Sequence, residues 1–262
     1  MIETNKIYCE NCLDTMARMP GNFIDLVVTS PPYDNLRDYK GYDFDFESIA
    51  KSLFRVIKKG GVVVWVVGDQ TVNGSETGTS FKQALYFKEI GFNLHDTMIY
   101  KKINPIPLTH NRYEQAFEYM FVFSKGKPKT FNPIRENTLT PGSYTHRRNT
   151  GITKEAATRN RDEITLTKET KYRINIWEYV CGCIADETGN HPAPFPERLS
   201  AEHILSWSNE GDLVYDPFSG SGTTCKMAKE HNRNYIGSEI SKEYCQIAEQ
   251  RLKILDQNPR FF

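Results

Sequence analysis

Two short apolar runs that end in turn residues constrain the fold more than any other feature of this chain. Val62 to Val67 is apolar at every position, and Ile24 to Thr29 carries four apolar residues before Ser30-Pro31-Pro32-Tyr33. Runs of this kind are typical of strands that are buried on both faces of a sheet. Residues 46–58 between them show helical spacing, so the order strand, helix, strand predicts an α/β fold with a parallel sheet.

The alternation of strands and helices continues on both sides of residues 125–175. We expect helices at 80–90, 223–231 and 242–254, the last capped by Ser241, and strands at 119–123, 212–215 and 235–237. We therefore predict a Rossmann-like, doubly wound, mostly parallel core in two halves, residues 1–124 and 176–262. Residues 125–175 separate these halves as an insertion.

The predicted insertion is basic although the chain as a whole is neutral. Residues 125–175 contain twelve Lys or Arg and five Asp or Glu, a net charge of +7, against a chain total of 33 basic and 33 acidic residues. Tyr144, His146 and Tyr172 are interleaved with these charges. The pattern favours a nucleic-acid-binding face over a solvated loop, since fifty residues is long for an idle connection.

Composition limits where this chain acts and what holds it together. A chain of 262 residues can bury a large core without disulfides, and no apolar run approaches the ~18 residues that span a membrane. We expect a cytoplasmic protein with no membrane contact and with reduced cysteines. Cys9 with Cys12, and Cys181 with Cys183, are spaced like zinc ligands, but each pair also fits a strand end, a helix start or a loop, so we expect no metal.

A glycine-rich turn marks the candidate cofactor site. Asp216-Pro-Phe-Ser-Gly220-Ser-Gly222-Thr-Thr224 lies between a predicted strand and a predicted helix, and Glu239 ends the next strand. Glycines permit close approach of a ligand, a helix N-terminus attracts an anion, and an acid in the position of Glu239 binds ribose. The third glycine of a dinucleotide site is replaced by Cys225 and no P-loop is present. Asp216 would repel a pyrophosphate and attract a cationic amino group, which favours S-adenosylmethionine.

A second motif follows the first buried strand. The prolines of Ser30-Pro31-Pro32-Tyr33 hold the chain extended and turn the Ser30 hydroxyl and the Pro31 carbonyl outward. Hydrogen-bond acceptors beside an aromatic ring suit a planar ring that carries an exocyclic amine. A strand that simply stops at prolines is the alternative.

These two motifs together resemble the amino-group DNA methyltransferases, the cytosine-N4 and adenine-N6 enzymes. Further similarity lies in Asn22 to Tyr33, in His191-Pro-Ala-Pro-Phe-Pro-Glu-Arg-Leu199 and in Tyr8-Cys-Glu-Asn-Cys-Leu-Asp14, where Glu10-Asn11 replaces the family's Gly-Asp. The order, with the catalytic motif before the cofactor turn, is similar to that of the β class.

The resemblance implies a seven-stranded sheet, S-adenosylmethionine as cofactor, and a target-recognition role for residues 125–175. It implies catalytic residues Ser30, Pro31, Pro32 and Tyr33. It implies cofactor-binding residues Asn11, Cys12, Asp216, Phe218, Ser219, Gly220, Gly222, Thr223 and Glu239. Within the basic insertion we expect DNA contacts from Arg147, Arg148, Lys171 and Arg173.

The residue types of the catalytic motif suit methylation of an amine. The lone pair of an exocyclic amine is conjugated with its ring, and acceptors on both N–H bonds, Ser30 Oγ and the Pro31 carbonyl, would redirect it towards a methyl donor. The base would leave the duplex and stack on Tyr33. A cytosine-C5 enzyme attacks through the thiolate of a Pro-Cys dipeptide, which this sequence lacks.

Several alternatives stay open at this stage. Ser30 favours cytosine N4 as the target because the resembling adenine-N6 enzymes usually carry Asp or Asn there. The other hypotheses are an enzyme that methylates RNA or a protein amide, and a non-catalytic DNA-binding module. Besides double-stranded DNA, we expect a cognate restriction endonuclease and a homodimer as partners.

Overall fold

The computed structural model describes residues 2–32, 44–105, 111–147, 163–180 and 196–257. The chain divides into two compact units. The larger unit, the core, consists of Met1–Asn132 and Asn175–Phe262, and the smaller unit is Pro133–Ile174.

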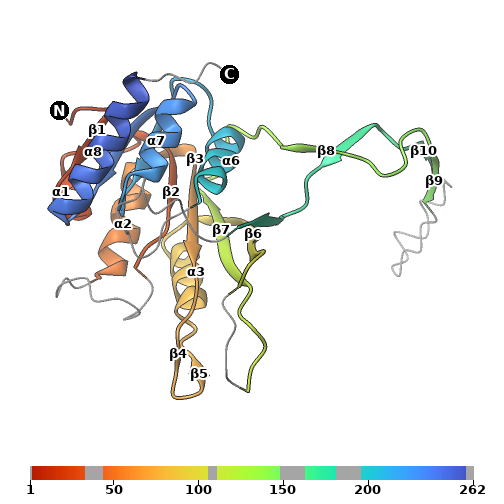
Figure 1. Cartoon of the computed structure of the whole chain (residues 1–262), viewed down its shortest axis with the longest axis horizontal. Coiled ribbons are helices and arrows are strands. Elements are labelled where there is room, and N and C mark those ends of the chain that lie inside the picture. Colours follow the sequence, from red (N-terminus) through yellow and green to blue (C-terminus); the bar gives the residue numbers. More distant parts are fainter. Residues whose placement is uncertain (1, 33–43, 106–110, 148–162, 181–195, 258–262) are drawn as a thin grey trace. The chain divides into compact units, whose positions relative to one another are not determined.

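The core is built on one sheet, which has eight strands among the described residues. Their spatial order is β1 (Lys6–Tyr8), β14 (Asn234–Ser238), β13 (Leu213–Asp216), β2 (Ile24–Thr29), β3 (Ile57–Val67), β7 (Phe117–Ser124), β6 (Asn93–Lys102) and β12 (Ile176–Tyr179) (Figure 1). In this sheet β7 is antiparallel to both of its neighbours, and the other pairs are parallel. The predicted α/β class and mostly parallel sheet are confirmed. The predicted count of seven is one short, because β12 adds to the edge of the sheet beside β6.

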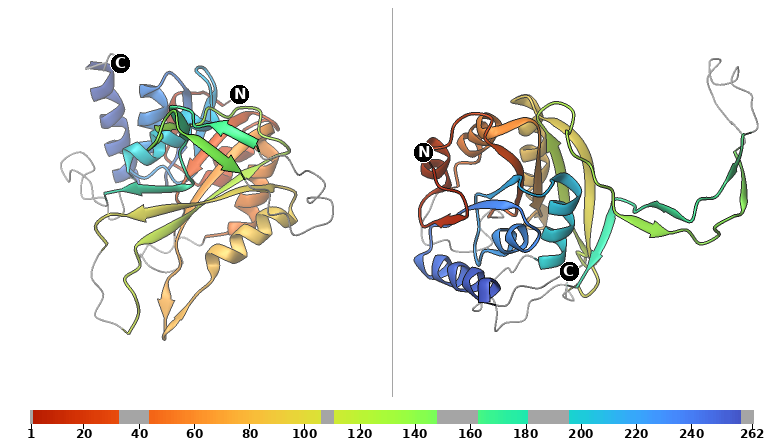
Figure 2. Two further views of the ribbon diagram at one scale, coloured as in Figure 1. Left: turned by 90° about the vertical axis from the view of Figure 1, so that its right-hand side faces the viewer. Right: turned by 90° about the horizontal axis from the view of Figure 1, so that it is seen from above.

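Two groups of helices cover the sheet, as expected for a doubly wound fold (Figure 2). In one group α1 (Cys12–Ala17) packs on α2 (Phe46–Val56), and α2 packs on α3 (Thr79–Glu89). In the other, α7 (Thr223–Glu230) packs on both α6 (Glu197–Trp207) and α8 (Lys242–Gln257).

The hydrophobic core centres on β3. Trp65 is completely buried, and its indole nitrogen donates to Gln83 Oε1 on α3 at 2.8 Å. The rings of Phe87 and Phe218 lie 5.1 and 6.1 Å from the Trp65 ring in edge-on geometry. Phe218 belongs to the glycine-rich turn, so the core directly supports the candidate cofactor site.

The boundary between α2 and β3 differs from the prediction. The helix predicted over 46–58 ends at Val56, and β3 begins at once with Ile57. A Cβ on Gly61 would lie 2.8 Å from the carbonyl oxygen of Asp25 on β2, so this glycine permits close approach of the two strands. The pair Gly60-Gly61 thus lies inside the strand and does not end the helix.

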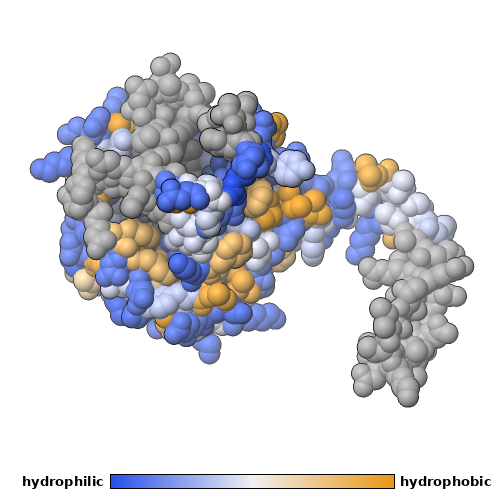
Figure 3. All heavy atoms as spheres, turned by 90° about the horizontal axis from the view of Figure 1, so that it is seen from below, coloured by the Kyte–Doolittle hydropathy of each residue, from blue (hydrophilic) through white to orange (hydrophobic). Residues whose placement is uncertain are grey.

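A small hairpin, β4 (Thr71–Val72) with β5 (Ser75–Glu76), follows β3 and projects from the core (Figure 1). Its turn residues Asn73 and Gly74 both have positive φ, as a tight two-residue hairpin requires. Viewed from the end towards which the hairpin projects, hydrophobic side chains form patches among hydrophilic ones (Figure 3). Exposed apolar side chains of the core include Val72, Phe81, Leu85 and Phe117.

Lys125, counted above in the basic insertion, belongs to the core. Its ammonium donates to Asn22 Oδ1 at 3.0 Å, to the Phe54 carbonyl at 2.8 Å and to the Ile57 carbonyl at 3.1 Å. It also lies 4.8 Å from the centre of the Phe54 ring. Partial burial lowers its pKa. Lys125 therefore satisfies carbonyls at the end of α2 and at the start of β3.

We expect Lys125→Met to lower the free energy of unfolding by roughly 2 to 3 kcal/mol, because two carbonyls lose a charged donor. Lys127→Met at an exposed neighbouring position should change it by less than about 0.5 kcal/mol. Urea denaturation measures both, and DNA affinity should be the same for the two variants. If the two variants were equally stable and only Lys125→Met lost DNA affinity, Lys125 would instead be a DNA contact.

The described residues of the smaller unit form two antiparallel strand pairs. β8 (Arg135–Asn137) pairs with β11 (Thr170–Tyr172), and β9 (Tyr144–Arg147) pairs with β10 (Glu163–Leu166). Its sequence has nine basic and five acidic residues, a net charge of +4. The remaining three basic residues of the predicted insertion, Lys125, Lys127 and Lys129, lie in the core.

Within the described ranges, no helix combines the length and the apolar character needed to cross a membrane.

Candidate active site

The two sequence motifs meet at the carboxyl ends of adjacent parallel strands. Thr29 ends β2 and Asp216 ends β13, and the Thr29 hydroxyl donates to Asp216 Oδ1 at 2.7 Å. Both side chains are buried. Thr224 adds a second link, because its hydroxyl donates to the Val28 carbonyl at 3.2 Å. Ser30, which is half-buried, and Pro31 and Pro32 continue directly from this junction.

The glycine-rich turn is held by its own backbone and by the neighbouring strand. Asp216 Oδ1 also accepts the Phe218 N–H at 3.0 Å, and the Ser219 N–H donates to the Ser238 carbonyl at 2.9 Å. The Gly222 N–H returns to the Ser219 carbonyl at 2.7 Å. Gly220 and Gly222 have φ of 51° and 80°, values that favour glycine.

Two predicted cofactor residues turn their side chains into the protein. The Ser219 hydroxyl lies 3.6 Å from the Cys225 sulfur, and the Thr223 hydroxyl accepts a hydrogen bond from Arg251. Both residues are buried. A ligand at these two positions would therefore contact the backbone of the turn and not the two side chains.

Glu239 joins three segments of the site. Its Oε2 accepts the Gly220 N–H at 2.8 Å, its Oε1 accepts the Ser241 N–H at 2.8 Å, and its own N–H donates to the Tyr8 carbonyl at 3.0 Å. Burial raises the pKa of the Glu239 carboxyl, and these backbone donors oppose the shift.

Asp216 is an acid whose charge is partly suppressed. Burial raises the pKa of its carboxyl from 3.8 to about 6, although the Thr29 hydroxyl and the Phe218 N–H donate hydrogen bonds to it. A bound cation would favour the ionised form. The base of the turn therefore suits a ligand that carries a positive charge.

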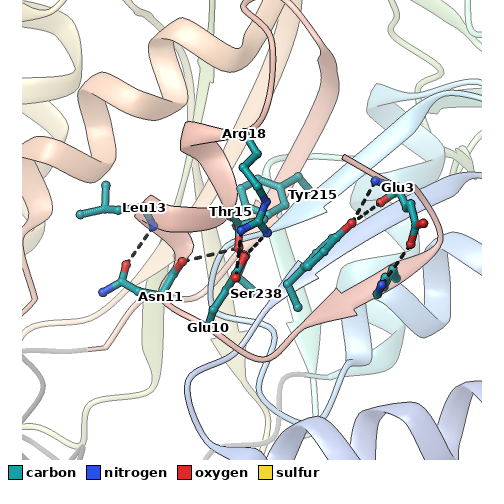
Figure 4. Close-up of polar contacts among 10 residues, drawn as sticks. Glu3, Glu10, Asn11, Leu13, Thr15, Arg18, Tyr215 and Ser238 are labelled. Carbon is teal, nitrogen blue, oxygen red and sulfur yellow. Dashed lines mark hydrogen bonds and ion pairs between the residues drawn. The ribbon is translucent and has the colours of Figure 1, made fainter. Parts of the chain in front are cut away.

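The connection from β1 to α1 explains how this chain accommodates Glu10-Asn11. Glu10 accepts from Thr15 Oγ1 at 2.7 Å and forms a bidentate ion pair with Arg18 (Figure 4). Asn11 Oδ1 accepts the Leu13 N–H at 2.8 Å and caps α1, while Asn11 itself is exposed. The two replacements thus leave the helix start intact.

Nearby, the buried Tyr215 and Ser238 hydroxyls lie 2.9 Å apart and join β13 to β14 (Figure 4). Cys12 is buried, which raises the pKa of its thiol to about 12.

Phe218 also forms an aromatic contact with the chain that returns from the catalytic motif. Its ring lies 5.6 Å from that of Phe44, in edge-on geometry. Tyr33, the fourth predicted catalytic residue, lies outside the described residues. The structure thus brings Ser30, Pro31 and Pro32 to the same edge of the sheet as the turn from Asp216 to Thr223.

The four predicted DNA contacts are described only in part. Arg147 ends β9, its side chain is not described, and Arg148 lies outside the described residues. Lys171 is exposed on β11. Arg173 forms an ion pair with Glu136 at 3.4 Å, and its side chain is only 11% exposed. Lys171 is therefore the better placed of the two described side chains.

No cluster of three or more metal-ligating side chains occurs in the described part of the chain. Cys9 is exposed and Cys12 is buried. Cys181 and Cys183 lie outside the described residues.

Sequence reasoning missed residues that hold the site from other elements. Thr29 ends the first apolar run, and no sequence pattern gives a role to it or to Glu197, Lys226 and Arg251. These residues meet their partners across 29 to 187 positions of sequence, so no local pattern marks them.

Comparison with known proteins assigns this geometry to a class of enzyme. The DNA methylase family model, named for N6 and N4 methyltransferases, matches residues 24–250. The chain belongs to this family and is a DNA methyltransferase of the amino-group type.

Individual relatives extend over most of the chain. The orphan methyltransferase M.BamHII of Bacillus amyloliquefaciens is 58% identical, and the match covers 88% of this chain and 89% of the relative. The type II methyltransferase M.BglII of Bacillus subtilis is 29% identical, over 95% of this chain and 69% of the relative.

Solved structures share the fold. The PvuII DNA methyltransferase, described as cytosine-N4-specific, superimposes with a TM-score of 0.69 at 22% identity, covering 94% of this chain and 85% of that one. The DNA modification methylase TTHA0409 of Thermus thermophilus, complexed with S-adenosyl-L-methionine, gives 0.66 at 25% identity and covers 98% and 95%. The family resemblance is confirmed, and S-adenosylmethionine is the cofactor of the family.

Proposed function

We propose that this enzyme transfers the methyl group of S-adenosylmethionine to the N4 amine of a cytosine that is flipped out of duplex DNA. The observation that carries the proposal is the hydrogen bond between Thr29 and Asp216. This contact supports the proposal because Ser30 and Pro31 directly follow Thr29, and Asp216 opens the turn that we propose for the methyl donor. Adenine N6 is the second candidate, by the same mechanism.

The donor set of the turn fits S-adenosylmethionine. A carboxylate has about four acceptor sites, and the two donors on Asp216 Oδ1 leave acceptor capacity for a cationic amino group. Three backbone donors on Glu239 likewise leave one site for a ribose hydroxyl. The start of α7 at Thr223 faces the turn and suits the ligand's carboxylate. When bound, the cofactor supplies an activated methyl group.

The residues of the catalytic motif act on the target amine. Ser30 Oγ and the Pro31 carbonyl accept its two N–H bonds, which directs the nitrogen lone pair out of conjugation and stabilises the positive charge that develops. The rigid Pro31-Pro32 backbone holds both acceptors in place. Tyr33 stacks on the extruded base.

Ser30 supports cytosine over adenine, because the adenine-N6 members that this motif resembles usually carry Asp or Asn there. The family match supports DNA over RNA or a protein amide. The basic smaller unit supports a role in target recognition, with Lys171 as an exposed contact. A homodimer and a cognate restriction endonuclease remain predictions, and the exposed apolar side chains of the core favour the first.

Transfer of labelled methyl groups tests the substrate class. The purified protein is incubated with methyl-labelled S-adenosylmethionine and either duplex DNA, the RNA duplex of the same sequence, or a carrier protein. Label should enter duplex DNA alone. Preferential labelling of RNA or of protein would contradict the proposal.

We expect Asp216→Asn to raise stability and to weaken cofactor binding. A folded-state pKa of about 6 exceeds the unfolded value, so the contribution of Asp216 to stability is largest below pH 4 and is lost as pH rises through 6. At pH 7.5 the buried charge therefore lowers stability by about 2 to 3 kcal/mol. Asparagine keeps an oxygen for Thr29 and Phe218 without that charge.

Thermal unfolding between pH 4 and 8 measures the first effect, and the advantage of Asp216→Asn should grow between pH 4 and 6 and level off above pH 6. Calorimetric titration measures the second, and the Kd of S-adenosylmethionine should rise at least tenfold at pH 7.5. For the wild type this Kd should also rise as pH falls below 6. A variant that is less stable than the wild type at pH 7.5, or that binds equally well, would refute this account of Asp216.

A further inference from the structure

The closing helix α8 contacts the cofactor turn along one face. Cys245, Ala248 and Arg251 follow one another at three-residue intervals and are all buried. The Cys245 thiol donates to the Glu239 carbonyl at 3.3 Å. Ala248 lies so close to Gly222 that a Cβ added there would be 2.7 Å from the Ala248 Cβ. Each successive turn of α8 thus meets a different part of the site.

Arg251 makes the most extensive of these contacts. Its NH1 group donates to the Ser221 carbonyl at 2.7 Å and to the Ser221 and Thr223 hydroxyls at 3.1 Å each. The side chain is only 7% exposed. Arg251 therefore holds the turn from α8 through Ser221 and Thr223, while Glu239 holds it through the Gly220 N–H.

Glu197 fixes the arginine in turn. Its Oε1 accepts Arg251 NH2 at 2.7 Å and Lys226 Nζ at 2.5 Å. Glu197 is the first residue of α6 and Lys226 lies on α7, so three helices converge on one carboxylate behind the turn. A guanidinium can contact the turn and the carboxylate at once through its fork of donors, whereas a lysine ammonium cannot match that geometry.

The turn needs such support because Gly220 and Gly222 give it many alternative conformations when it is free. Ordering a loop during ligand binding lowers affinity, and a turn that is ordered in advance avoids this loss. The contacts of Arg251 are made with the turn itself.

We infer that Arg251 is a positioning residue that preorganises the Gly220–Thr223 turn for S-adenosylmethionine, with Glu197 orienting its guanidinium. The inference rests on the proposed function, because it takes this turn as the cofactor site. Arg251 itself acts through the turn and does not touch the reacting atoms.

The test compares two buried arginines of the core. Arg233 is 9% exposed and donates to the Ser208 carbonyl, the Ser208 hydroxyl and the His231 carbonyl, just before β14 and at the opposite end of that strand from Glu239. Arg251→Met and Arg233→Met each remove a buried cation with several hydrogen bonds. Calorimetric titration gives the Kd of S-adenosylmethionine and the binding-competent fraction, and steady-state assays give KM for cofactor and for DNA.

Arg251→Met should raise the Kd and the KM for S-adenosylmethionine at least tenfold and leave the KM for DNA within twofold. Arg233→Met should lower the melting temperature comparably and leave the Kd of the folded fraction unchanged. Arg251→Lys and Glu197→Gln should give intermediate Kd values, and Arg251→Lys replaces the Met variant if that one fails to fold.

Equal Kd values for the folded fractions of the Arg251 and Arg233 variants would show a merely structural role and overturn the inference. Failure of the wild type to bind S-adenosylmethionine would instead overturn the cofactor site, and the inference with it.

Discussion

Replacing Ser30 by alanine is expected to lower kcat for methyl transfer at least 100-fold and to leave the Kd of S-adenosylmethionine within twofold. The hydroxyl acts on the target amine in the transition state, and removal of one such group typically reduces rates by about 10² to 10³. That loss corresponds to about 2.7 kcal/mol or more of transition-state stabilisation. The cofactor contacts, which lie on the turn from Asp216 to Thr223, remain.

Single-turnover kinetics with a saturating duplex separate this effect from binding. Ser48→Ala on α2, where the hydroxyl bonds Asp45, serves as a control and should keep kcat. Parallel losses of kcat and cofactor affinity in Ser30→Ala would mean that the amine pocket and the cofactor pocket are misassigned.

The second large effect is expected from Gly222→Ala. A Cβ at this position would lie 2.7 Å from the Ala248 Cβ and 3.1 Å from its Cα, and the backbone φ is +80°. Helix α8 would have to shift, and overpacking adds to the strain of a left-handed residue. We expect a loss of about 2 to 4 kcal/mol in the free energy of unfolding and a rise of at least 30-fold in the Kd of S-adenosylmethionine.

Gly211 provides a matched control, because it has a φ of +82° and nothing within 4 Å of an added Cβ. Gly211→Ala should lower stability by only about 1 kcal/mol, with cofactor affinity unchanged. Urea denaturation and calorimetric titration compare the two. Adding Ala248→Gly to Gly222→Ala should recover part of the lost affinity through a favourable coupling. Equal effects of the two single alanine variants would remove the steric argument.

The sequence predicts those parts of the fold that local patterns encode. The apolar runs at β2 and β3, the helical spacing of α2, and the glycine-rich turn before α7 all lie close to their expected places. Strand β6 was not predicted, because it carries polar residues such as His95, Asp96 and Thr97 along with its apolar ones. β12 has only four residues and takes its place through pairing with β6.

The candidate site shows the same division. Its motifs can be read from the sequence because prolines and glycines impose local geometry, but their meeting through Thr29 and Asp216 depends on strand order. The contacts of Arg251 depend on how α8 packs on the turn. Lys125 illustrates how a charge count differs from a contact, since a lysine counted in the basic insertion donates to carbonyls at the end of α2 and the start of β3.

The most direct test of the central claim is the identity of the methylated nucleoside. Duplex DNA of mixed sequence is incubated with the enzyme and methyl-labelled S-adenosylmethionine, digested to nucleosides, and analysed by chromatography and mass spectrometry. The proposal predicts that the label is in N4-methylcytosine and that Ser30→Ala slows its formation at least 100-fold. Label in N6-methyladenine would contradict the assignment of cytosine as the target base.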